Sequence, residues 1–338
     1  MTHTVTLIPG DGIGPEITSA TRRMLEAAGA AIDWDEQLGG VAALNEVGTP
    51  LPDATVESMR RSGVALKGPL TTPVGSGFRS VNVALRKEFD LYANVRPAKT
   101  IIPGGRYEDV DIVLIRENTE GLYVGFETTI RVGDDPKAVA QSTAIVTRRG
   151  CERIVRFAFE YAEANGRREV TICHKANILK AVSGLFLEVG REVANEFSGR
   201  VAVRDVIIDA AAMKLVLDPT QFDVIVTTNM FGDILSDEIA GLVGGLGVAP
   251  GANIGARAAM FEAVHGSAPD IAGRGVANPT ALALAGCMLL EHLDAHETAR
   301  RLRRALEGVL RDREVRTPDL GGNATTTEFT EAVLRRLG

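Results

Sequence analysis

Short apolar runs alternate with helical patterns along the whole of this 338-residue chain. The apolar runs are typical of buried strands, and they lie at residues 5–8, 64–66, 112–115, 170–173 and 224–227. Apolar residues with helical spacing fall at 16–28, 81–89, 148–164, 184–195, 281–293 and 295–310. An alternation of this kind predicts the α/β class.

The bulk properties limit the domain count and the partners. A chain of this length is large for one core, which favours two domains or one domain with a large insertion. The formal net charge of −7 leaves no broad basic surface for nucleic acid or an acidic membrane. The longest apolar run, 281–290, is too short to span a bilayer. We therefore expect no nucleic-acid partner and no membrane partner.

The cysteines and the first residues bear on the compartment. Cys151, Cys173 and Cys287 are far apart and include no CxxC pair. Such cysteines indicate neither a zinc site nor a disulfide framework, and they fit a reducing compartment. The chain enters an apolar strand within its first residues, which leaves no room there for a signal or transit peptide. We therefore expect a cytoplasmic protein.

Arginines and small polar residues gather in the segment 67–97 and just beyond it. Ser80 and Asn82 are followed by Arg86 and Arg96, and Arg116 comes with the next element. Each arginine alone is explained by an exposed surface charge. Together with hydroxyl and amide donors, the three arginines suit a small molecule that carries several carboxylates.

Two acidic residues stand four positions apart in the stretch GDILSD, at Asp233 and Asp237. On a helix both carboxylates would share one face, where like charges repel unless a cation lies between them. Oxygen ligands of this type suit magnesium or manganese rather than zinc. On spacing alone, two solvated aspartates remain the simpler interpretation.

The glycine-rich stretch 10–14, GDGIG, follows a strand and precedes a helix. This position invites a dinucleotide-binding interpretation, but Pro15 stands where the third glycine of G-x-G-x-x-G belongs. We therefore predict a tight glycine turn with a structural role.

Seven blocks, in order along the chain, resemble the isocitrate and isopropylmalate dehydrogenase family, in its isocitrate branch. They are IPGDGIGPEI at the start, RENTEGLY at 116–123, HKANI at 174–178, GDILSD at 232–237, HGSAPDIAG at 265–273, ANPTA at 277–281 and DLGGNATT at 319–326. The resemblance implies an isopropylmalate dehydrogenase-like two-domain fold that is not a Rossmann fold. Residues 1–98 and 250–338 would form a large cofactor-binding domain, and residues 99–249 a small inserted dimerisation domain. The segment of about 124–147 would be an antiparallel arm that clasps a second subunit.

The resemblance also implies an activity. It is the oxidative decarboxylation of isocitrate, a small tricarboxylate of the tricarboxylic acid cycle, to 2-oxoglutarate and CO₂. The cofactors would be NAD and Mg²⁺ or Mn²⁺, and the enzyme would be a homodimer or a larger homo-oligomer. An oligomer is implied because the family supplies the positions of Lys175 and Asp209 to the active site of the neighbouring subunit.

Matching to the family's motifs assigns a role to each candidate residue. Tyr123 would protonate the product enolate, and Lys175 would take up the proton of the substrate hydroxyl. The metal would be held by Asp209, Asp233 and Asp237. The substrate would be contacted by Ser80, Asn82, Arg86, Arg96, Arg116 and Asn177. The dinucleotide would be contacted by Thr71, Thr72, His265, Asp270, Ile271 and Asn278.

Asp270 and Ile271 bear on the choice between NAD and NADP. Members of the family that use NADP carry basic and tyrosyl residues at these positions. A carboxylate accepts hydrogen bonds from the ribose hydroxyls and repels a 2′-phosphate, which favours NAD. The same sequence also fits an aspartate that lies in a surface loop and contacts no ribose.

Three alternatives remain open at this stage. Homoisocitrate dehydrogenase performs the same chemistry on a longer substrate, but that branch tends to be apolar at the position of Asn82. Isopropylmalate would need an apolar surface where Ser80 and Asn82 stand. Some relatives are regulatory subunits without turnover, and these usually lose part of the catalytic set.

Overall fold

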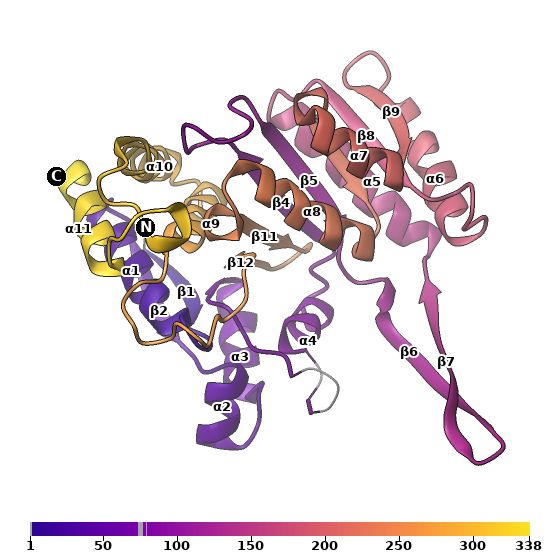
Figure 1. Ribbon diagram of the computed structural model, residues 1–338, viewed down its shortest axis with the longest axis horizontal. Coiled ribbons are helices and arrows are strands. Elements are labelled where there is room, and N and C mark those ends of the chain that lie inside the picture. Colours follow the sequence, from indigo (N-terminus) through magenta and orange to yellow (C-terminus); the bar gives the residue numbers. More distant parts are fainter. Residues whose placement is uncertain (1, 74–76, 79) are drawn as a thin grey trace. The chain divides into compact units, whose positions relative to one another are not determined.

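The chain forms two compact units in the computed structural model, which describes residues 2–73, 77–78 and 80–338. The first unit consists of Met1–Leu91, Arg96–Val110 and Ala240–Gly338, and the second of Tyr92–Val95 and Asp111–Ile239. Both chain ends therefore belong to the first unit (Figure 1). Residues 74–76 and 79, inside the segment predicted to bind substrate, lie outside the described residues.

The first unit is built on a sheet with the strand order β2-β1-β3-β12-β11. These strands are β1 (His3–Ile8), β2 (Ile32–Glu36), β3 (Val64–Lys67), β11 (Pro250–Ile254) and β12 (Ala259–Ala263). Neighbours pair in parallel except β11, which is antiparallel to β12. Helix α9 (Thr280–His292) packs on β11 and β12 because nearly all of its residues are apolar and buried. The strand β4 (Ala93–Lys99) contributes residues to both units.

Further helices surround this sheet. They are α1 (Gly14–Ala27), α2 (Gly40–Val47), α3 (Asp53–Ser62), α4 (Val81–Glu88), α10 (His296–Asp312) and α11 (Thr326–Leu337). Helices α1 and α10 pack on α9, and α11 packs on α1 and α10. The first turn of α11 is fixed by a capping box, in which Thr325 and Glu328 bond each other's backbone N–H groups.

The glycine turn between β1 and α1 is confirmed. Gly10 and Gly12 have φ angles of 82° and 58°, which glycine adopts without strain. A Cβ atom at Gly12 would lie 2.0 Å from the carbonyl oxygen of Ser267, so the turn also needs glycine for close packing. The Asp11 carboxylate accepts the N–H groups of Val41, Ala42 and Thr71, which fixes the start of α2 and the strand-end loop.

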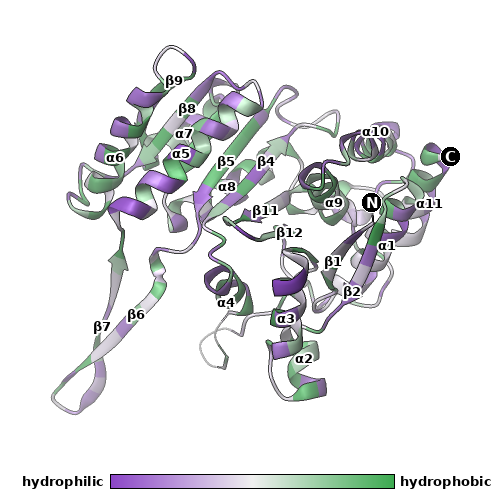
Figure 2. Cartoon of the chain, turned by 180° about the vertical axis from the view of Figure 1, so that it is seen from behind, coloured by the Kyte–Doolittle hydropathy of each residue, from purple (hydrophilic) through white to green (hydrophobic). Residues whose placement is uncertain are grey.

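The second unit has a parallel sheet in the order β5-β10-β8-β9. Its strands are β5 (Asp111–Glu117), β8 (Glu169–His174), β9 (Ala202–Ile207) and β10 (Val224–Thr227). The middle strands are buried along nearly their whole length, and β5 is coloured as hydrophobic in Figure 2. The helices are α5 (Arg148–Ala164), α6 (Val182–Glu196), α7 (Ile208–Leu217) and α8 (Asn229–Val243), of which α8 continues past Ile239 into the first unit. Helix α5 packs on β5, β8 and β10 with its apolar stripe.

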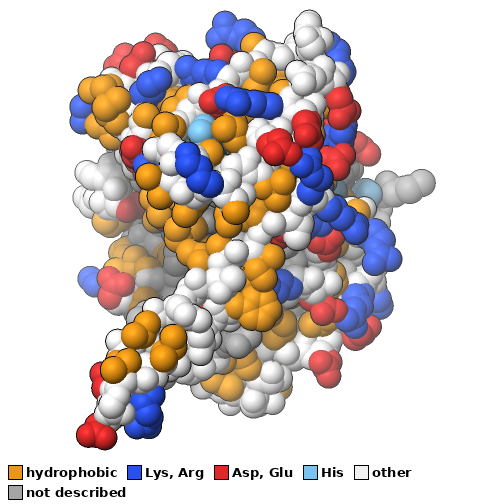
Figure 3. All heavy atoms as spheres, turned by 90° about the vertical axis from the view of Figure 1, so that its right-hand side faces the viewer, with side chains coloured by type: hydrophobic (Ala, Val, Ile, Leu, Met, Phe, Trp, Pro, Cys, Tyr) orange, Lys and Arg blue, Asp and Glu red, His pale blue; other side chains and the backbone are white. Residues whose placement is uncertain are grey.

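An antiparallel hairpin extends from this second unit. It consists of β6 (Gly121–Val132) and β7 (Asp135–Ile145), joined at Gly133 and Asp134. Its apolar side chains are exposed in the single chain, with Phe126 at 61% and Val132 at 60%, and Figure 3 shows hydrophobic side chains along it. The antiparallel pairing expected over about 124–147 is observed in β6 and β7, and its contact with a second subunit stays a prediction.

The predicted α/β class is confirmed, and each predicted strand and helix overlaps an observed one. Local patterns were sufficient because strands buried on both faces have short continuous apolar runs, and most of the helices have an apolar stripe of period 3.6. No helix among the described residues is long and apolar enough to cross a membrane.

Candidate active site

Helix α4 carries Ser80, Asn82 and Arg86 of the predicted substrate group. Val81 and Leu85 are buried in a cluster with Ile8 and other core residues, which fixes the rotation of the helix. Ser80 is the N-cap, and its Oγ accepts the N–H of Val83 at 3.4 Å. Asn82 and Arg86 are one helical turn apart and therefore share a face. Asn82 Oδ1 is buried with no hydrogen-bond partner among the described residues.

A buried ion cluster surrounds the end of Arg86. Glu262 on β12 lies 2.8 Å from Lys67 Nζ and 3.2 Å from Arg86 Nη2, and it accepts from Asn253 Nδ2 at 2.7 Å. Burial by itself would raise the pKa of Glu262. The attraction of Lys67 and Arg86, with hydrogen bonds from Lys67 and Asn253, lowers that pKa below its ordinary value.

The cluster contains more positive than negative charge. Lys67 and Arg86 face the single carboxylate of Glu262, so one positive charge is uncompensated within the cluster. Arg86 Nε is buried and has no hydrogen-bond partner among the described residues. A buried surplus cation is costly unless an anion joins it. The arrangement therefore suits a ligand carboxylate.

Arg116, Tyr123 and Asp233 contact one another in the second unit. Arg116 on β5 is 1% exposed, and it donates to Asn229 Oδ1 from Nε at 3.0 Å and from Nη2 at 2.7 Å. Its Nη1 donates to Asp233 Oδ1. Tyr123 Oη donates to Asp233 Oδ2 at 2.5 Å, and the Arg116 guanidinium lies 5.2 Å from the centre of the tyrosine ring. Three residues with separately predicted roles thus share one location.

The expected metal ligands fall into two groups within the single chain. Asp233 and Asp237 lie one turn apart on α8, as the sequence predicts. Asp209 lies in the first turn of α7, where it accepts a hydrogen bond from Lys175 Nζ at 2.5 Å. This bond lowers the pKa of Asp209. No group of three or more metal-ligating side chains forms among the described residues of one chain.

Arg96 and Asn177 are the remaining members of the predicted substrate group. Arg96 lies on β4 and is 8% exposed. Asn177 lies in the turn after β8, next to Lys175, and is exposed in the single chain. The guanidinium of Arg96 is charged in any protein environment and the amide of Asn177 is neutral, so only Arg96 can bind a substrate carboxylate as an ion pair.

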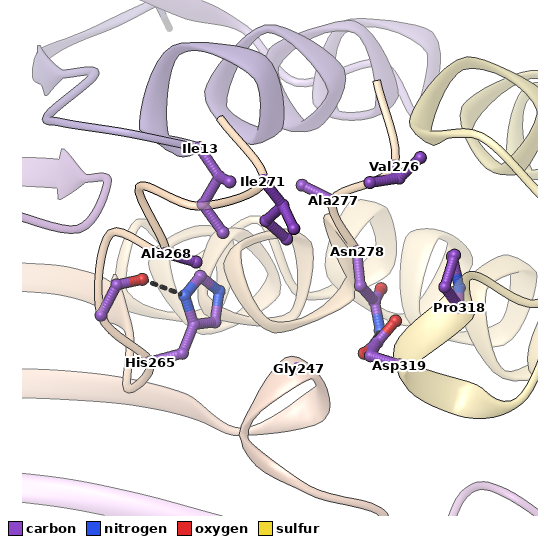
Figure 4. Close-up of a pocket in the computed structure, with 11 residues that line it drawn as sticks. Ile13, Gly247, His265, Ala268, Ile271, Val276, Ala277, Asn278, Pro318 and Asp319 are labelled. Carbon is purple, nitrogen blue, oxygen red and sulfur yellow. Dashed lines mark hydrogen bonds between the residues drawn. The ribbon is translucent and has the colours of Figure 1, made fainter. Parts of the chain in front are cut away.

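A cavity of about 540 Å³ lies in the first unit, and it contains three of the residues predicted to bind the dinucleotide. These are His265, Ile271 and Asn278, shown in Figure 4. Burial lowers the pKa of His265, so the ring is neutral at neutral pH. Its Nδ1 lies 2.9 Å from the Gly266 carbonyl oxygen, which can only accept. The proton is therefore on Nδ1, and Nε2 is a hydrogen-bond acceptor.

The amide of Asn278 is fixed within this cavity. Its Nδ2 donates to Asp319 Oδ2 at 2.9 Å, and its Oδ1 accepts the N–H of Thr280 at 3.0 Å. A Cβ atom at Gly247 would lie 2.3 Å from Asp319 Oδ2. Sequence reasoning assigned no role to Asp319 or Gly247. Asp319 is the acidic residue of the block DLGGNATT, and its place in that block was the signal that could have identified it.

Thr71, Thr72 and Asp270 do not line this cavity. Thr71 bonds Ser267 through the two hydroxyl groups at 2.6 Å, which joins its loop to the loop that follows His265. Thr72 and Asp270 are exposed. The structure thus brings together half of the predicted dinucleotide residues, and Asp270 is adjacent in sequence to Ile271 at the cavity.

Comparisons with known proteins show which family the chain resembles over its length. A family model described as isocitrate/isopropylmalate dehydrogenase matches residues 4–333. The chain is 48% identical over 337 residues to the mitochondrial NAD isocitrate dehydrogenase catalytic subunit 5 of Arabidopsis thaliana, with 99% of this chain and 88% of that protein covered. It is 46% identical over 336 residues to a mitochondrial regulatory subunit of NAD isocitrate dehydrogenase from Dictyostelium discoideum, with 98% and 91% covered. The crystal structure of isocitrate dehydrogenase from Methylococcus capsulatus is 54% identical, with a TM-score of 0.97 and 99% of both chains covered.

The predicted cytoplasmic location is wrong by this comparison. The curated relatives from Arabidopsis thaliana, Macaca fascicularis and Schizosaccharomyces pombe are all named as mitochondrial proteins. Unpaired cysteines report reducing conditions and not a particular compartment, which is why the cysteine argument could not find the location.

The names of the relatives favour isocitrate over homoisocitrate and isopropylmalate as the substrate class of this branch. The family match spans nearly the whole chain, and the structural neighbour has the same α/β fold over its full length. On these grounds the chain belongs to the isocitrate/isopropylmalate dehydrogenase family.

Proposed function

We propose that this chain is a catalytic NAD-dependent isocitrate dehydrogenase, which oxidises isocitrate and releases CO₂ to give 2-oxoglutarate. The observation that carries the proposal is the contact of Arg116 and Tyr123 with Asp233. It brings a carboxylate-binding cation, a proton donor and a hard oxygen ligand to one place. An oxidative decarboxylation of a tricarboxylate needs all three.

The arginines bind and orient the substrate carboxylates. Arg86 contributes the uncompensated charge of its buried cluster, and Arg96 and Arg116 are buried as well. Ser80 and Asn82 lie at the start of the same helix as Arg86 and bind the remaining substrate carboxylate through hydrogen bonds. Fixing several carboxylates at once restricts the substrate to one orientation.

Asp233 and Asp237, with Asp209 of a second subunit, would hold Mg²⁺ or Mn²⁺. The donor set fits, because it consists of carboxylate oxygens, and two of them lie one helical turn apart on α8. A bound cation would supply polarisation of the substrate oxygen during oxidation and decarboxylation. A site completed by a second chain explains why the three aspartates do not meet in one.

Two side chains handle protons in this proposal. Lys175, as the neutral amine, accepts the proton of the substrate hydroxyl, and its Nζ donates a hydrogen bond to the carboxylate of Asp209. Tyr123 returns a proton to the product enolate from Oη, which donates to Asp233. Lys175 acts in the active site of the neighbouring subunit, so the working enzyme is a homodimer or a larger homo-oligomer.

The cavity around His265 and Asn278 holds the adenosine part of NAD. Bound NAD would supply the hydride acceptor for the oxidation. Among the residues that line the cavity there is no lysine or arginine, and the charged one is Asp319. A lining of this kind favours ribose hydroxyls over a 2′-phosphate. Thr71 and Thr72 would lie toward the nicotinamide.

The domain division is part of the same proposal. Residues 1–98 and 250–338 serve as the cofactor-binding domain, and residues 99–249 as the dimerisation domain with its arm at about 124–147. Support comes from the compact units, which differ from this division by assigning residues 99–110 and 240–249 to the first unit and residues 92–95 to the second. The exposed apolar side chains of the hairpin support its contact with a second copy.

The test is NADH production by the purified chain alone, with isocitrate, homoisocitrate and isopropylmalate compared at equal concentration. We expect turnover with isocitrate and at least about tenfold lower kcat/KM with the others. One relative, at 46% identity, is named as a regulatory subunit. Absence of turnover with every substrate, in a folded chain that still binds isocitrate, would assign that role instead.

A further inference from the structure

His174 occupies the last position of β8, immediately before Lys175. Its side chain is buried, and Nδ1 accepts the N–H of Ala176 at 3.1 Å. The ring therefore binds a backbone N–H group two residues further along the chain, as the side chain does in an Asx turn.

The hydrogen bond specifies which ring nitrogen is the acceptor. Nδ1 can accept the N–H of Ala176 only when it carries no proton. Nε2 lies 3.5 Å from Asp205 Oδ2 on β9, and Asp205 also accepts from Arg191 on α6 at 2.7 Å. The nearby carboxylate favours the tautomer that has its proton on Nε2. The carboxylate of Asp205 and the hydrogen bond from Ala176 therefore favour the same tautomer, with the proton on Nε2.

The backbone of Lys175 is held from several sides at the same turn. Its N–H donates to Ser183 Oγ at 2.7 Å. Its carbonyl oxygen accepts the N–H groups of Ile178 at 3.0 Å and Leu179 at 2.9 Å. His174 adds the bond to the next N–H along the chain. The direction in which the lysine side chain leaves the strand is set by these bonds.

We infer that His174 is a positioning residue for Lys175: by accepting the N–H of Ala176 through Nδ1, it sets the turn from which the lysine reaches the substrate hydroxyl. The inference rests on the proposed role of Lys175 as the proton acceptor. His174 acts through the backbone and touches neither substrate nor cofactor. Its contribution is to keep Nζ where proton transfer takes place, and misplacement of a reacting group by about 1 Å can cost on the order of a hundredfold in rate.

A pair of amide variants separates this role from packing. The side-chain amide of His174→Asn stands at the position of Nδ1 and retains an acceptor for Ala176. That of His174→Gln stands at the position of Nε2 and is closer to histidine in size. We expect kcat within about threefold of wild type for His174→Asn and a fall of about ten- to a hundredfold for His174→Gln. KM for isocitrate and NAD should stay within about twofold in both, because the lysine acts in the chemical step.

Several outcomes would overturn the inference. Wild-type kcat in His174→Gln would show that the bond is dispensable. An equal fall in both variants would assign His174 to packing, because the acceptor is then without effect. If His174→Gln does not fold, a fall of more than about tenfold in a folded His174→Asn overturns it and a smaller change upholds it. Lys175→Ala is measured beside them: full activity in that variant removes the proposed role of the lysine itself, which separates the two failures.

Discussion

Tyr123 donates a hydrogen bond from Oη to Asp233 Oδ2 over 2.5 Å, while Arg116 bonds the other oxygen of the same carboxylate. The proposed proton donor is thus bonded directly to a proposed metal ligand. The charge at Asp233 therefore bears on the proton of Tyr123, because a charged acceptor makes a stronger hydrogen bond than a neutral one.

The first prediction concerns the metal. Asp233→Asn should lower kcat by at least about a thousandfold while thermal unfolding remains cooperative, because a neutral amide is a much weaker cation ligand. Chelator should abolish wild-type turnover, and Mg²⁺ or Mn²⁺ should restore it. Asp312→Asn, which only breaks a surface pair with Arg336, is the control and should keep wild-type activity. Full activity in excess chelator would exclude a catalytic cation.

The second prediction concerns sharing of the active site between chains. Lys175→Ala and Asp233→Asn should each be inactive, but a mixture that exchanges subunits should recover activity. In a mixed dimer one site receives both wild-type residues, so about one quarter of the sites should work after full exchange at equal amounts. Exchange is verified by mass spectrometry of differently tagged chains. Demonstrated exchange without recovered turnover would place both residues in the same chain's site.

The third prediction concerns Ser80, the N-cap of α4. Ser80→Ala should raise KM for isocitrate by about tenfold and cost the helix about 1 kcal/mol of stability. Aspartate also caps helices, so Ser80→Asp should keep the fold while repelling the substrate carboxylates and nearly abolishing binding. A phosphate on Ser80 should act in the same way through its larger negative charge. Thr325→Asp, at the N-cap of α11, controls for the substitution itself, and near-normal isocitrate kinetics in Ser80→Asp would remove Ser80 from the site.

The fourth prediction concerns the dinucleotide. The wild-type chain should prefer NAD over NADP by on the order of a hundredfold in kcat/KM. The ribose hydroxyl of NAD can donate a hydrogen bond to the Asp270 carboxylate, whereas this carboxylate repels the 2′-phosphate of NADP. Asp270→Lys combined with Ile271→Tyr should erode or invert this ratio with little change in isocitrate KM. Glu46→Lys, an equal charge change on exposed α2, should leave the ratio unaltered. Equal use of both cofactors by the wild type would contradict the role given to Asp270.

The fifth prediction concerns the buried cluster of Glu262, Lys67 and Arg86. Glu262→Gln should destabilise the fold by about 3–5 kcal/mol, because two buried cations lose their carboxylate. Glu331→Gln, which breaks an exposed pair with Arg23, should cost less than about 1 kcal/mol. Urea unfolding measures both changes. Equal costs would mean that the Glu262 pairs contribute no more than surface pairs.

The same cluster predicts a pH dependence with a definite sign. The pKa of Glu262 is lowered in the folded state from its ordinary value of 4.5. Its contribution to stability is therefore complete above about pH 4.5 and declines as the pH falls toward the folded-state pKa. The stability difference between wild type and Glu262→Gln should be constant from about pH 7 to about pH 5 and shrink in more acidic solution. A difference that grows on acidification would contradict the direction of the pKa shift.

The sequence by itself determined the elements that have a local pattern. Helix α5 runs over Arg148–Ala164, as its apolar periodicity predicts. Asp233 and Asp237 share a face of α8 because a helix has about 3.6 residues per turn. Strand β12 was not predicted, because its apolar run contains Glu262. A glutamate in a sequence indicates an exposed position unless the cations that neutralise it are known.

Only the tertiary structure decided which distant side chains meet. Arg86 and Glu262 are 176 residues apart in sequence, and Arg116 and Asp233 are 117 apart. The hydrogen bond between Asn278 and Asp319 likewise joins two loops, and no local pattern in either loop predicts that they meet. Periodicity reports how a segment buries its own face, whereas ion pairs and hydrogen bonds between distant segments depend on strand order and helix packing in the folded chain. For that reason the residue types of the site were readable from the sequence, and the partners that hold them in place were not.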